Sequence, residues 1–190
     1  SGIITYYALC PNTREYLRVP LTSPLIIGQV YTVSMYVSFG DECQRASNNI
    51  GMLLSTNGAL TDAVASCTPA NGVVSLATPQ VDFTTVFTDF TNWPLVSSNI
   101  LAASAFTFLY IGNFFDDANT NILNNPSGTF DVEAYYYIDD VSITLVPNAF
   151  TVSIANTAPA CNGQCTGTAT ANPVNGTSPY TYLWSPSGGT

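Results

Sequence analysis

The stretch Glu133–Leu145, EAYYYIDDVSITL, decides the fold. It runs through three tyrosines and Ile138 to two adjacent aspartates, Asp139 and Asp140, and then alternates hydrophobic with hydroxyl residues. Such an alternation buries one face of a β-strand, so the pattern predicts a long strand that closes a sheet. Two neighbouring carboxylates inside a strand are costly unless backbone donors or a cation compensate them. The acidic pair is therefore the first candidate site in the chain.

The composition indicates a folded, acidic protein. The chain has 190 residues, of which 46% are apolar and 8% are charged, so it is long enough to bury a sizeable core. Twelve acidic residues against three basic ones give a net charge of −9, which repels phosphate backbones and anionic membranes. We therefore expect no nucleic-acid partner, whereas metal cations and neutral glycans are compatible with the charge. The acidity alternatively serves solubility alone.

Several features predict an exported all-β protein. Small, hydroxylated and β-favouring residues dominate, and Gly, Pro and Asn mark the turns. No apolar run is long enough to cross a bilayer, so we expect no membrane insertion. Five cysteines without a histidine suit a disulfide-forming extracellular or cell-surface protein better than a zinc site. Because no initiator methionine or signal-like start is present, we expect Ser1 to be an internal point of a longer chain.

The order of elements predicts two domains. Strands are expected at residues 15–19, 30–39, 49–55, 80–90, 95–97, 105–112 and 133–145. Seven to eight short strands separated by turn signals are typical of a jelly-roll β-sandwich. After Pro147 the chain becomes rich in Gly, Thr, Ala and Pro, so we place the domain boundary there, giving domains 1–147 and 148–190.

Three segments carry a resemblance to a known family. They are REYLRVPLTSPLIIGQVYTVSMYVSF (14–39), YIGNFFDDANTN (110–121) and YYYIDDVSITLV (135–146). Together they resemble the galactose-binding-like jelly-roll modules, which include many carbohydrate-binding modules and occur in large surface proteins of gliding, Bacteroidetes-type bacteria. The resemblance implies a structural calcium ion held by Asp139 or Asp140. It also implies that the N-terminal strand of the jelly roll is missing.

The tail, CNGQCTGTATANPVNGTSPYTYLWS (161–185), is similar to the SprB-type repeat of gliding-motility adhesins. The resemblance implies the first half of an immunoglobulin-like sandwich, with Trp184 in its core. It also implies a large adhesin that is exported by the type IX route.

Catalysis is not expected. The chain has no histidine or lysine, so the usual bases for a serine or cysteine nucleophile are absent. A two-carboxylate glycosidase site would need residues from two different acidic pairs to converge, because neighbours in a strand point to opposite faces. We therefore expect a protein that is not an enzyme.

Calcium has two candidate positions. Asp116, Asp117, Asn119 and Asn121 form a D-D-x-N-x-N loop of hard oxygen ligands, without the glycine and distal glutamate of an EF-hand. The second option joins Asp139 or Asp140 to Asp41 or Glu42. Alternatively, these side chains cap turns through bonds to the backbone.

Exposed aromatic rings would provide a platform for sugars, since a flat ring complements the apolar face of a pyranose. The candidates for ligand binding are Tyr36, Trp93, Tyr110 and Tyr136. Alternatively, each of these side chains packs in a core, as Tyr and Trp commonly do in β-sandwiches.

The cysteines allow several disulfides. Cys161 and Cys165 are close enough to pair locally, although Cys161 could also pair with a cysteine beyond Thr190. Among Cys10, Cys43 and Cys67, we expect a Cys43–Cys67 bridge that restrains the segment between them.

These observations predict a non-enzymatic extracellular module of a large surface adhesin. Its partners would be a polysaccharide or surface glycan, and neighbouring domains or copies of the same polypeptide. The alternative is a structural subunit or spacer of an extracellular filament in which strands are shared between chains.

Overall fold

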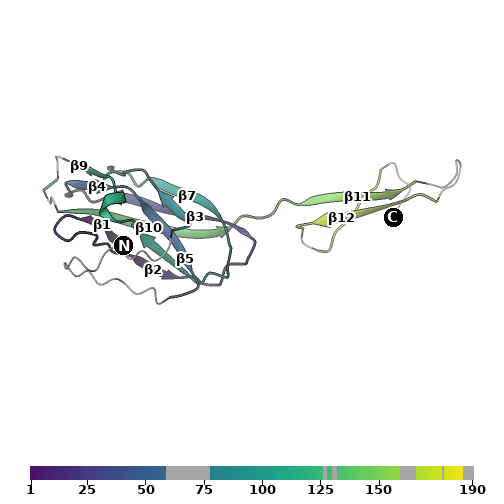
Figure 1. Cartoon of the computed structure of the whole chain (residues 1–190). Coiled ribbons are helices and arrows are strands. Elements are labelled where there is room, and N and C mark those ends of the chain that lie inside the picture. The colour runs from purple at the N-terminus through teal and green to yellow at the C-terminus, as the bar shows by residue number, and fades with distance from the viewer. Residues whose placement is uncertain (59–77, 126–127, 130–131, 159–165, 177, 186–190) are drawn as a thin grey trace. The chain divides into compact units, whose positions relative to one another are not determined.

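The computed structural model describes residues 1–58, 78–125, 128–129, 132–158, 166–176 and 178–185 (Figure 1). The chain divides into two compact units, Ser1–Val146 and Pro147–Thr190, and the division falls one residue before the boundary expected from the sequence. Cys67, Cys161 and Cys165 lie outside the described residues, and so does the expected local disulfide between Cys161 and Cys165.

The prediction of an all-β protein is confirmed for the described residues. The strands of the first unit are β1 (Gly2–Tyr7), β2 (Leu17–Pro20), β3 (Val30–Phe39), β4 (Arg45–Ser47), β5 (Ile50–Ser55), β6 (Val81–Phe83), β7 (Leu95–Leu101), β8 (Phe108–Gly112), β9 (Ile122–Asn124) and β10 (Glu133–Leu145). A 3₁₀ turn, η1 (Asp117–Asn119), precedes β9. The described part of the chain has no helix that is long and apolar enough to span a membrane.

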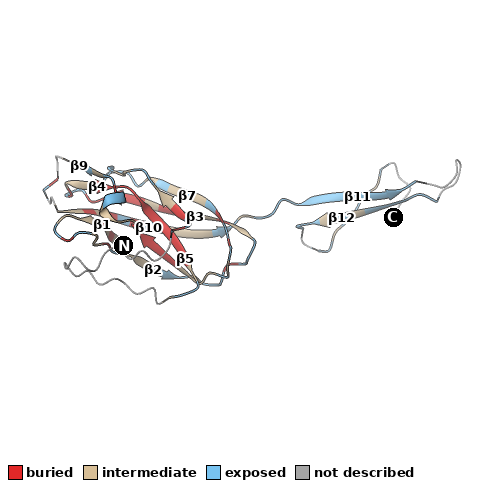
Figure 2. Ribbon diagram, in the orientation of Figure 1, coloured by how far each residue is buried: buried red, intermediate tan, exposed pale blue. Residues whose placement is uncertain are grey.

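Antiparallel pairing joins these strands into sheets. One four-stranded sheet has the order β1-β10-β3-β7, the other has the order β2-β8-β5-β6, and β4 pairs with β9. The two larger sheets share one hydrophobic core, which includes Met35 of β3, Met52 of β5, Ile111 of β8 and Tyr136 of β10. Figure 2 shows the buried residues gathered on β3, β5 and β10.

Two strand predictions are confirmed in detail. In β3 the side chains from Tyr31 to Phe39 at odd positions are buried, as the alternation of that segment predicts. The segment 105–112 is apolar on both faces, and its strand β8 lies between β2 and β5 rather than at an edge.

The predicted strand 80–90 is wrong beyond Phe83, where β6 ends. Val86 and Phe87 still pack against the core, but from an irregular segment. The carbonyl oxygen of Phe87 lies 2.9 Å from the Tyr136 hydroxyl, and the carbonyl of Asp89 accepts a hydrogen bond from the Phe39 amide. These tertiary contacts hold the segment after Phe83 in place of the hydrogen bonds of a continuous strand.

A β-bulge in β10 explains the adjacent aspartates. Asp139 pairs with Tyr36 of β3, and the next pair joins Ser142 to Ser34, so one extra residue is inserted into β10. Asp140 has a φ of 46°, in the left-handed region, and its amide donates to Asp139 Oδ1 at 2.9 Å. Because of the bulge both carboxylates are exposed, and neither one needs a buried partner.

The bulge also changes which positions of β10 face the core, from even-numbered to odd-numbered residues. Before it, Ala134, Tyr136 and Ile138 face the core at even positions. After it, Val141 and Ile143 pack against the same core at odd positions. A strand with uninterrupted period two could not bury both sets on one face.

The second unit contains a two-stranded hairpin of β11 (Thr151–Thr157) and β12 (Thr168–Val174). Phe150 stacks on Tyr180 with 6.2 Å between the ring centroids, and the Tyr180 hydroxyl donates to the Gly176 carbonyl at 2.8 Å. Figure 2 shows that β11 is exposed along its length.

Substitutions at Asp140 test the bulge. We expect Asp140→Val to lower the free energy of unfolding by about 1–2 kcal/mol, because a β-branched residue is strained at positive φ. Asp140→Gly removes the same carboxylate without strain and should be as stable as the parent or more stable. Urea denaturation of both variants gives the comparison. Equal stability of the two variants would contradict the role assigned to backbone strain.

Candidate functional site

A row of aromatic side chains lies on the outer face of the first sheet. Since Ala134, Tyr136 and Ile138 of β10 point to the core, the intervening residues, Tyr135 and Tyr137, point outward. Their rings meet edge to face, with 5.2 Å between centroids and an interplanar angle of 77°.

Trp93 extends the row from the turn that precedes β7. Its ring lies 6.3 Å from that of Tyr137, and the two side chains are 43% and 42% exposed. Asp89 holds this turn, because its Oδ1 accepts hydrogen bonds from the amides of Thr91 and Asn92. The Trp93 ring is therefore presented to solvent on a braced turn. We call Tyr36, Trp93, Tyr135 and Tyr137 the aromatic row.

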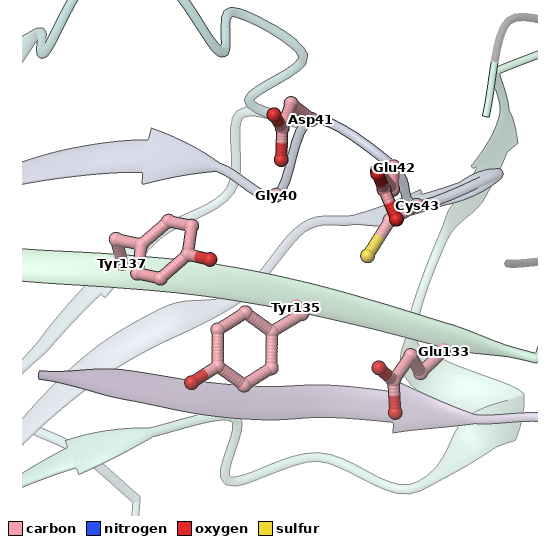
Figure 3. A pocket seen from close by; sticks show the side chains of 7 residues that line it. All are labelled: Gly40, Asp41, Glu42, Cys43, Glu133, Tyr135 and Tyr137. Carbon is pink, nitrogen blue, oxygen red and sulfur yellow. The ribbon is translucent and has the colours of Figure 1, made fainter. Parts of the chain in front are cut away.

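Two hollows open along the aromatic row. The first has a volume of about 370 Å³ and lies where the turn after β3 meets β10. Figure 3 shows its lining residues, Gly40, Asp41, Glu42, Cys43, Glu133, Tyr135 and Tyr137. A Cβ on Gly40 would lie 3.1 Å from the Cys43 sulfur and 3.2 Å from the Tyr135 carbonyl, so the turn packs closely against β10. A Cβ on Gly2 of β1 would collide with the Tyr135 ring, so the absence of a side chain at position 2 leaves room for that ring.

The second hollow, of about 270 Å³, is lined by Tyr36, Trp93, Asp139 and Asp140. Tyr36 lies opposite Asp139 in the β3–β10 ladder. The bulge adds the Asp140 carboxylate to the same rim. The two hollows are linked through the contact between Trp93 and Tyr137.

Negatively charged side chains surround the aromatic row. Asp41, Glu42 and Glu133 line the first hollow, and Asp139 and Asp140 line the second. No arginine is among the described residues that line either hollow.

Burial and negative neighbours also affect two neutral groups of the first hollow. Desolvation, followed by the nearby Tyr137, Glu15 and Glu133, raises the pKa of Tyr135. Desolvation also raises the pKa of Cys43, so its thiol stays protonated near neutral pH.

The structure brings together only two of the four predicted aromatic residues, Tyr36 and Trp93. The prediction for Tyr110 and Tyr136 is wrong, because both side chains are buried. The Tyr110 hydroxyl donates to the Asn57 carbonyl at 3.1 Å. The Tyr136 hydroxyl accepts from the Ser47 amide and lies 2.9 Å from the carbonyl oxygens of Ser47 and Phe87.

Tyr135, Tyr137 and Glu133 were missed in the sequence, although the signal for them was present. Period two along residues 133–139 places Glu133, Tyr135, Tyr137 and Asp139 on one face once Tyr136 is assigned to the core. The sequence alone does not say which of three consecutive tyrosines is buried.

In the described structure, side chains and backbone groups of the D-D-x-N-x-N loop contact other protein groups. Asp116 Oδ1 caps η1 by accepting from the amide and side chain of Asn119. Asp117 Oδ1 forms an ion pair of 2.8 Å with the Arg14 guanidinium, and its Oδ2 accepts from the Asn12 amide. Asn121 pairs with Asn48, its amide donating to Asn48 Oδ1 and its carbonyl accepting from the Asn48 amide.

Arg14 therefore supplies the cation of this loop. Its side chain is 1% exposed and also donates to the Thr13 carbonyl and the Thr120 hydroxyl. Its guanidinium carbon lies 6.0 Å from the centre of the Tyr6 ring. The loop carboxylates are thus used for capping and ion pairing, as the alternative interpretation of the sequence holds.

The two carboxylate pairs of the second calcium option line different hollows. Asp41 and Glu42 line the first hollow, whereas Asp139 and Asp140 line the second. Among the residues that the structure describes, no group of three or more His, Cys, Asp or Glu side chains could hold a metal ion.

The predicted Cys43–Cys67 disulfide is wrong, since Cys43 is a free, buried thiol. Cys10 is instead disulfide-bonded. The physical reason is local: the turn at Gly40 directs the Cys43 sulfur toward the backbone of β10, between the carboxylates of the first hollow (Figure 3).

Tyr136→Phe tests the buried hydroxyl. We expect a loss of about 1–3 kcal/mol in the free energy of unfolding at neutral pH, because the Ser47 amide loses its acceptor. Burial raises the pKa of Tyr136, so above pH ~10 the folded state retains a proton that the unfolded chain releases. The unfolding free energy of the parent should therefore fall as the pH rises through that range, and that of the variant should fall less steeply. Urea denaturation at neutral and alkaline pH measures both effects, and parallel pH profiles would contradict this assignment.

Thermal denaturation in calcium and in chelator tests whether Arg14, and not calcium, compensates the carboxylate of Asp117. We expect the same melting temperature in both buffers, and a loss of about 2–4 kcal/mol in Arg14→Met, which leaves Asp117 without its partner. A melting temperature that rises by several degrees in calcium would contradict the assignment of Arg14 as the loop cation.

Comparison with known proteins does not assign this chain to a family. No protein-family model matches the chain, and no curated protein or solved structure shows significant similarity to it. The resemblance to jelly-roll modules and adhesin repeats therefore stays a prediction, and function is argued from the residues themselves.

Proposed function

We propose that the chain is a non-enzymatic extracellular module of a cell-surface adhesin, and that its aromatic row binds a glycan. The observation that carries this proposal is the linked pair of hollows on one sheet face. Four aromatic side chains surround them, and carboxylates lie at both rims.

The chemistry of the row suits a carbohydrate. The apolar face of a pyranose packs on a flat ring, and the exposed rings of Trp93 and Tyr137 lie next to each other at 6.3 Å. The carboxylates of Asp139 and Asp140 accept hydrogen bonds from sugar hydroxyl groups. Tyr36 lines the same hollow, so one sugar unit has both apolar and polar partners there.

The charge favours glycans over other polymers. Five carboxylates along the row repel phosphate groups, which argues against a nucleic acid or an anionic membrane surface as the ligand. The absence of histidine and lysine from the sequence supports binding without catalysis. The disulfide at Cys10 supports an oxidising, extracellular location.

We assign the first unit to the jelly-roll class and the second unit to the first half of an immunoglobulin-like repeat. Two antiparallel four-stranded sheets around one core support the first assignment. The hairpin of β11 and β12 supports the second. The sequence resemblance supports a place in a large adhesin of gliding bacteria that is exported by the type IX route.

Trp93→Ala tests the proposal. We expect at least a tenfold loss of affinity, about 1.4 kcal/mol, for a polysaccharide or oligosaccharide that the parent binds on a glycan array. The matched control is Tyr182→Ala, which removes an exposed aromatic ring of the second unit.

Both variants should melt like the parent, since both side chains are exposed. Binding that survives in Trp93→Ala, or that is lost equally in the control, would contradict glycan binding on the aromatic row. A folded parent that binds nothing on the array would overturn the proposed ligand class.

A further inference from the structure

The first hollow of the aromatic row carries an unbalanced charge. Three carboxylates, those of Asp41, Glu42 and Glu133, line its volume of about 370 Å³. Figure 3 shows that they come from two sides, Asp41 and Glu42 from the turn after β3 and Glu133 from the start of β10. No cationic side chain is among the described residues of the lining. Because like charges repel one another across such a hollow, a positively charged group is attracted into it.

The three charges act together on the thiol of Cys43, which is 6% exposed and belongs to the same lining. Desolvation raises the pKa of this thiol most, and Glu133, Asp41 and Glu42 each raise it further. A hydrogen bond with the backbone of Tyr135 acts in the opposite direction. The carboxylates therefore act on one region of the hollow, so one bound cation would interact with all of them.

The arginines of the chain have their contacts elsewhere. The sequence contains three arginines and no lysine. Arg14 pairs with Asp117 at 2.8 Å, and Arg18 donates to a backbone carbonyl beyond β5. Arg45 lies 5.9 Å from the centre of the Tyr6 ring. The protein thus compensates the carboxylate of Asp117 with a cation of its own, but it places none of these three side chains in the lining of the first hollow.

Two tyrosine rings give the hollow an aromatic surface. Tyr135 and Tyr137 line it with their rings edge to face at 5.2 Å, and Tyr137 is 42% exposed. The face of an aromatic ring attracts a cation and also packs against the apolar face of a sugar ring. Since the Tyr137 ring lies 6.3 Å from that of Trp93, this surface continues toward the second hollow. A ligand that combines a sugar ring with a positive charge suits both features.

We propose that the first hollow binds the protonated amino group of an amino sugar, and that the next unit of the same glycan packs on Trp93. The inference rests on the proposed function and narrows its ligand to glycans with free amino groups. Glu42 and Glu133 select the ligand through charge, whereas Trp93 binds sugar rings of either kind. A neutral sugar leaves the carboxylates of the hollow without a positive partner, so it binds less tightly.

Two oligosaccharides that differ in one group per unit test this preference. One is built of glucosamine, and the other is built of glucose with the same linkage and length, so that a hydroxyl group replaces each amino group. Calorimetric titrations are run at about pH 5.5, where amino groups are protonated and most carboxylates are ionised. We expect the parent to bind the amino form at least about tenfold more tightly, because hydrogen bonds between charged groups replace neutral ones.

Substitutions on the two sides of the hollow test the residues. Glu42→Gln and Glu133→Gln each remove one charge at nearly constant shape, and each should lower the ratio of the two affinities by about threefold or more. The matched control is Asp116→Asn, which removes a charge outside both hollows and keeps a side-chain oxygen that caps η1. It should keep the ratio of the parent. Trp93→Ala should weaken the binding of both oligosaccharides.

A second pH separates charge from shape. At about pH 8.5 most amino groups of the ligand are neutral, so the preference for the amino form should largely disappear. Among the described groups that face the hollow besides the carboxylates, Cys43 and Tyr135 have pKa values that desolvation raises, so both stay neutral at either pH. Tyr137 and Glu15 act on Tyr135 in the same direction. The change in preference between the two pH values therefore reports the charge of the ligand.

The possible outcomes separate this inference from the proposed function. Equal affinity of the parent for the two oligosaccharides would overturn the inference and leave glycan binding in place. An unchanged ratio in both Glu42→Gln and Glu133→Gln would also overturn it, because the amino group would then lie outside the first hollow. An oligolysine of equal charge that binds as tightly as the amino form would overturn the assignment to a sugar. A folded parent that binds neither oligosaccharide, nor any other glycan, would overturn the proposed function and this inference with it.

Discussion

The first unit depends on the bulge at Asp139–Asp140 of β10. Two hydrophobic segments of opposite parity share this strand, with Tyr136 and Ile138 before the bulge and Val141 after it. One inserted residue lets both segments face the same core and places two carboxylates in solvent instead of burying one of them. The cost is one residue at positive φ, which Asp tolerates better than most side chains.

The bulge also divides β10 into two surfaces. Before it, the outward side chains Tyr135 and Tyr137 belong to the aromatic row. After it, Val141 and Ile143 line a hollow that Val19 of β2 also borders.

Buried polar groups hold loops of the first unit in place. The Tyr136 hydroxyl ties β10 to β4 and to the irregular segment at Phe87. Arg14 ties the N-terminal loop to η1 through Asp117. Each group has little or no exposure, so its hydrogen bonds are not exchanged with water and each is costly to remove. In this way short strands joined by long loops keep one arrangement.

The sequence by itself determined the all-β class, the alternation of β3, the central position of β8 and the division near Pro147, because these follow from local periodicity and composition. It identified Tyr36, Trp93 and the acidic pair as candidates for a site, but it could not separate Tyr135 and Tyr137 from the buried Tyr136. Only the tertiary structure decided the bulge, the pairing of Asp117 with Arg14 and the free thiol of Cys43. These features join residues that are far apart in the chain, or depend on which face of a strand meets the core, and local pattern carries no information about such contacts.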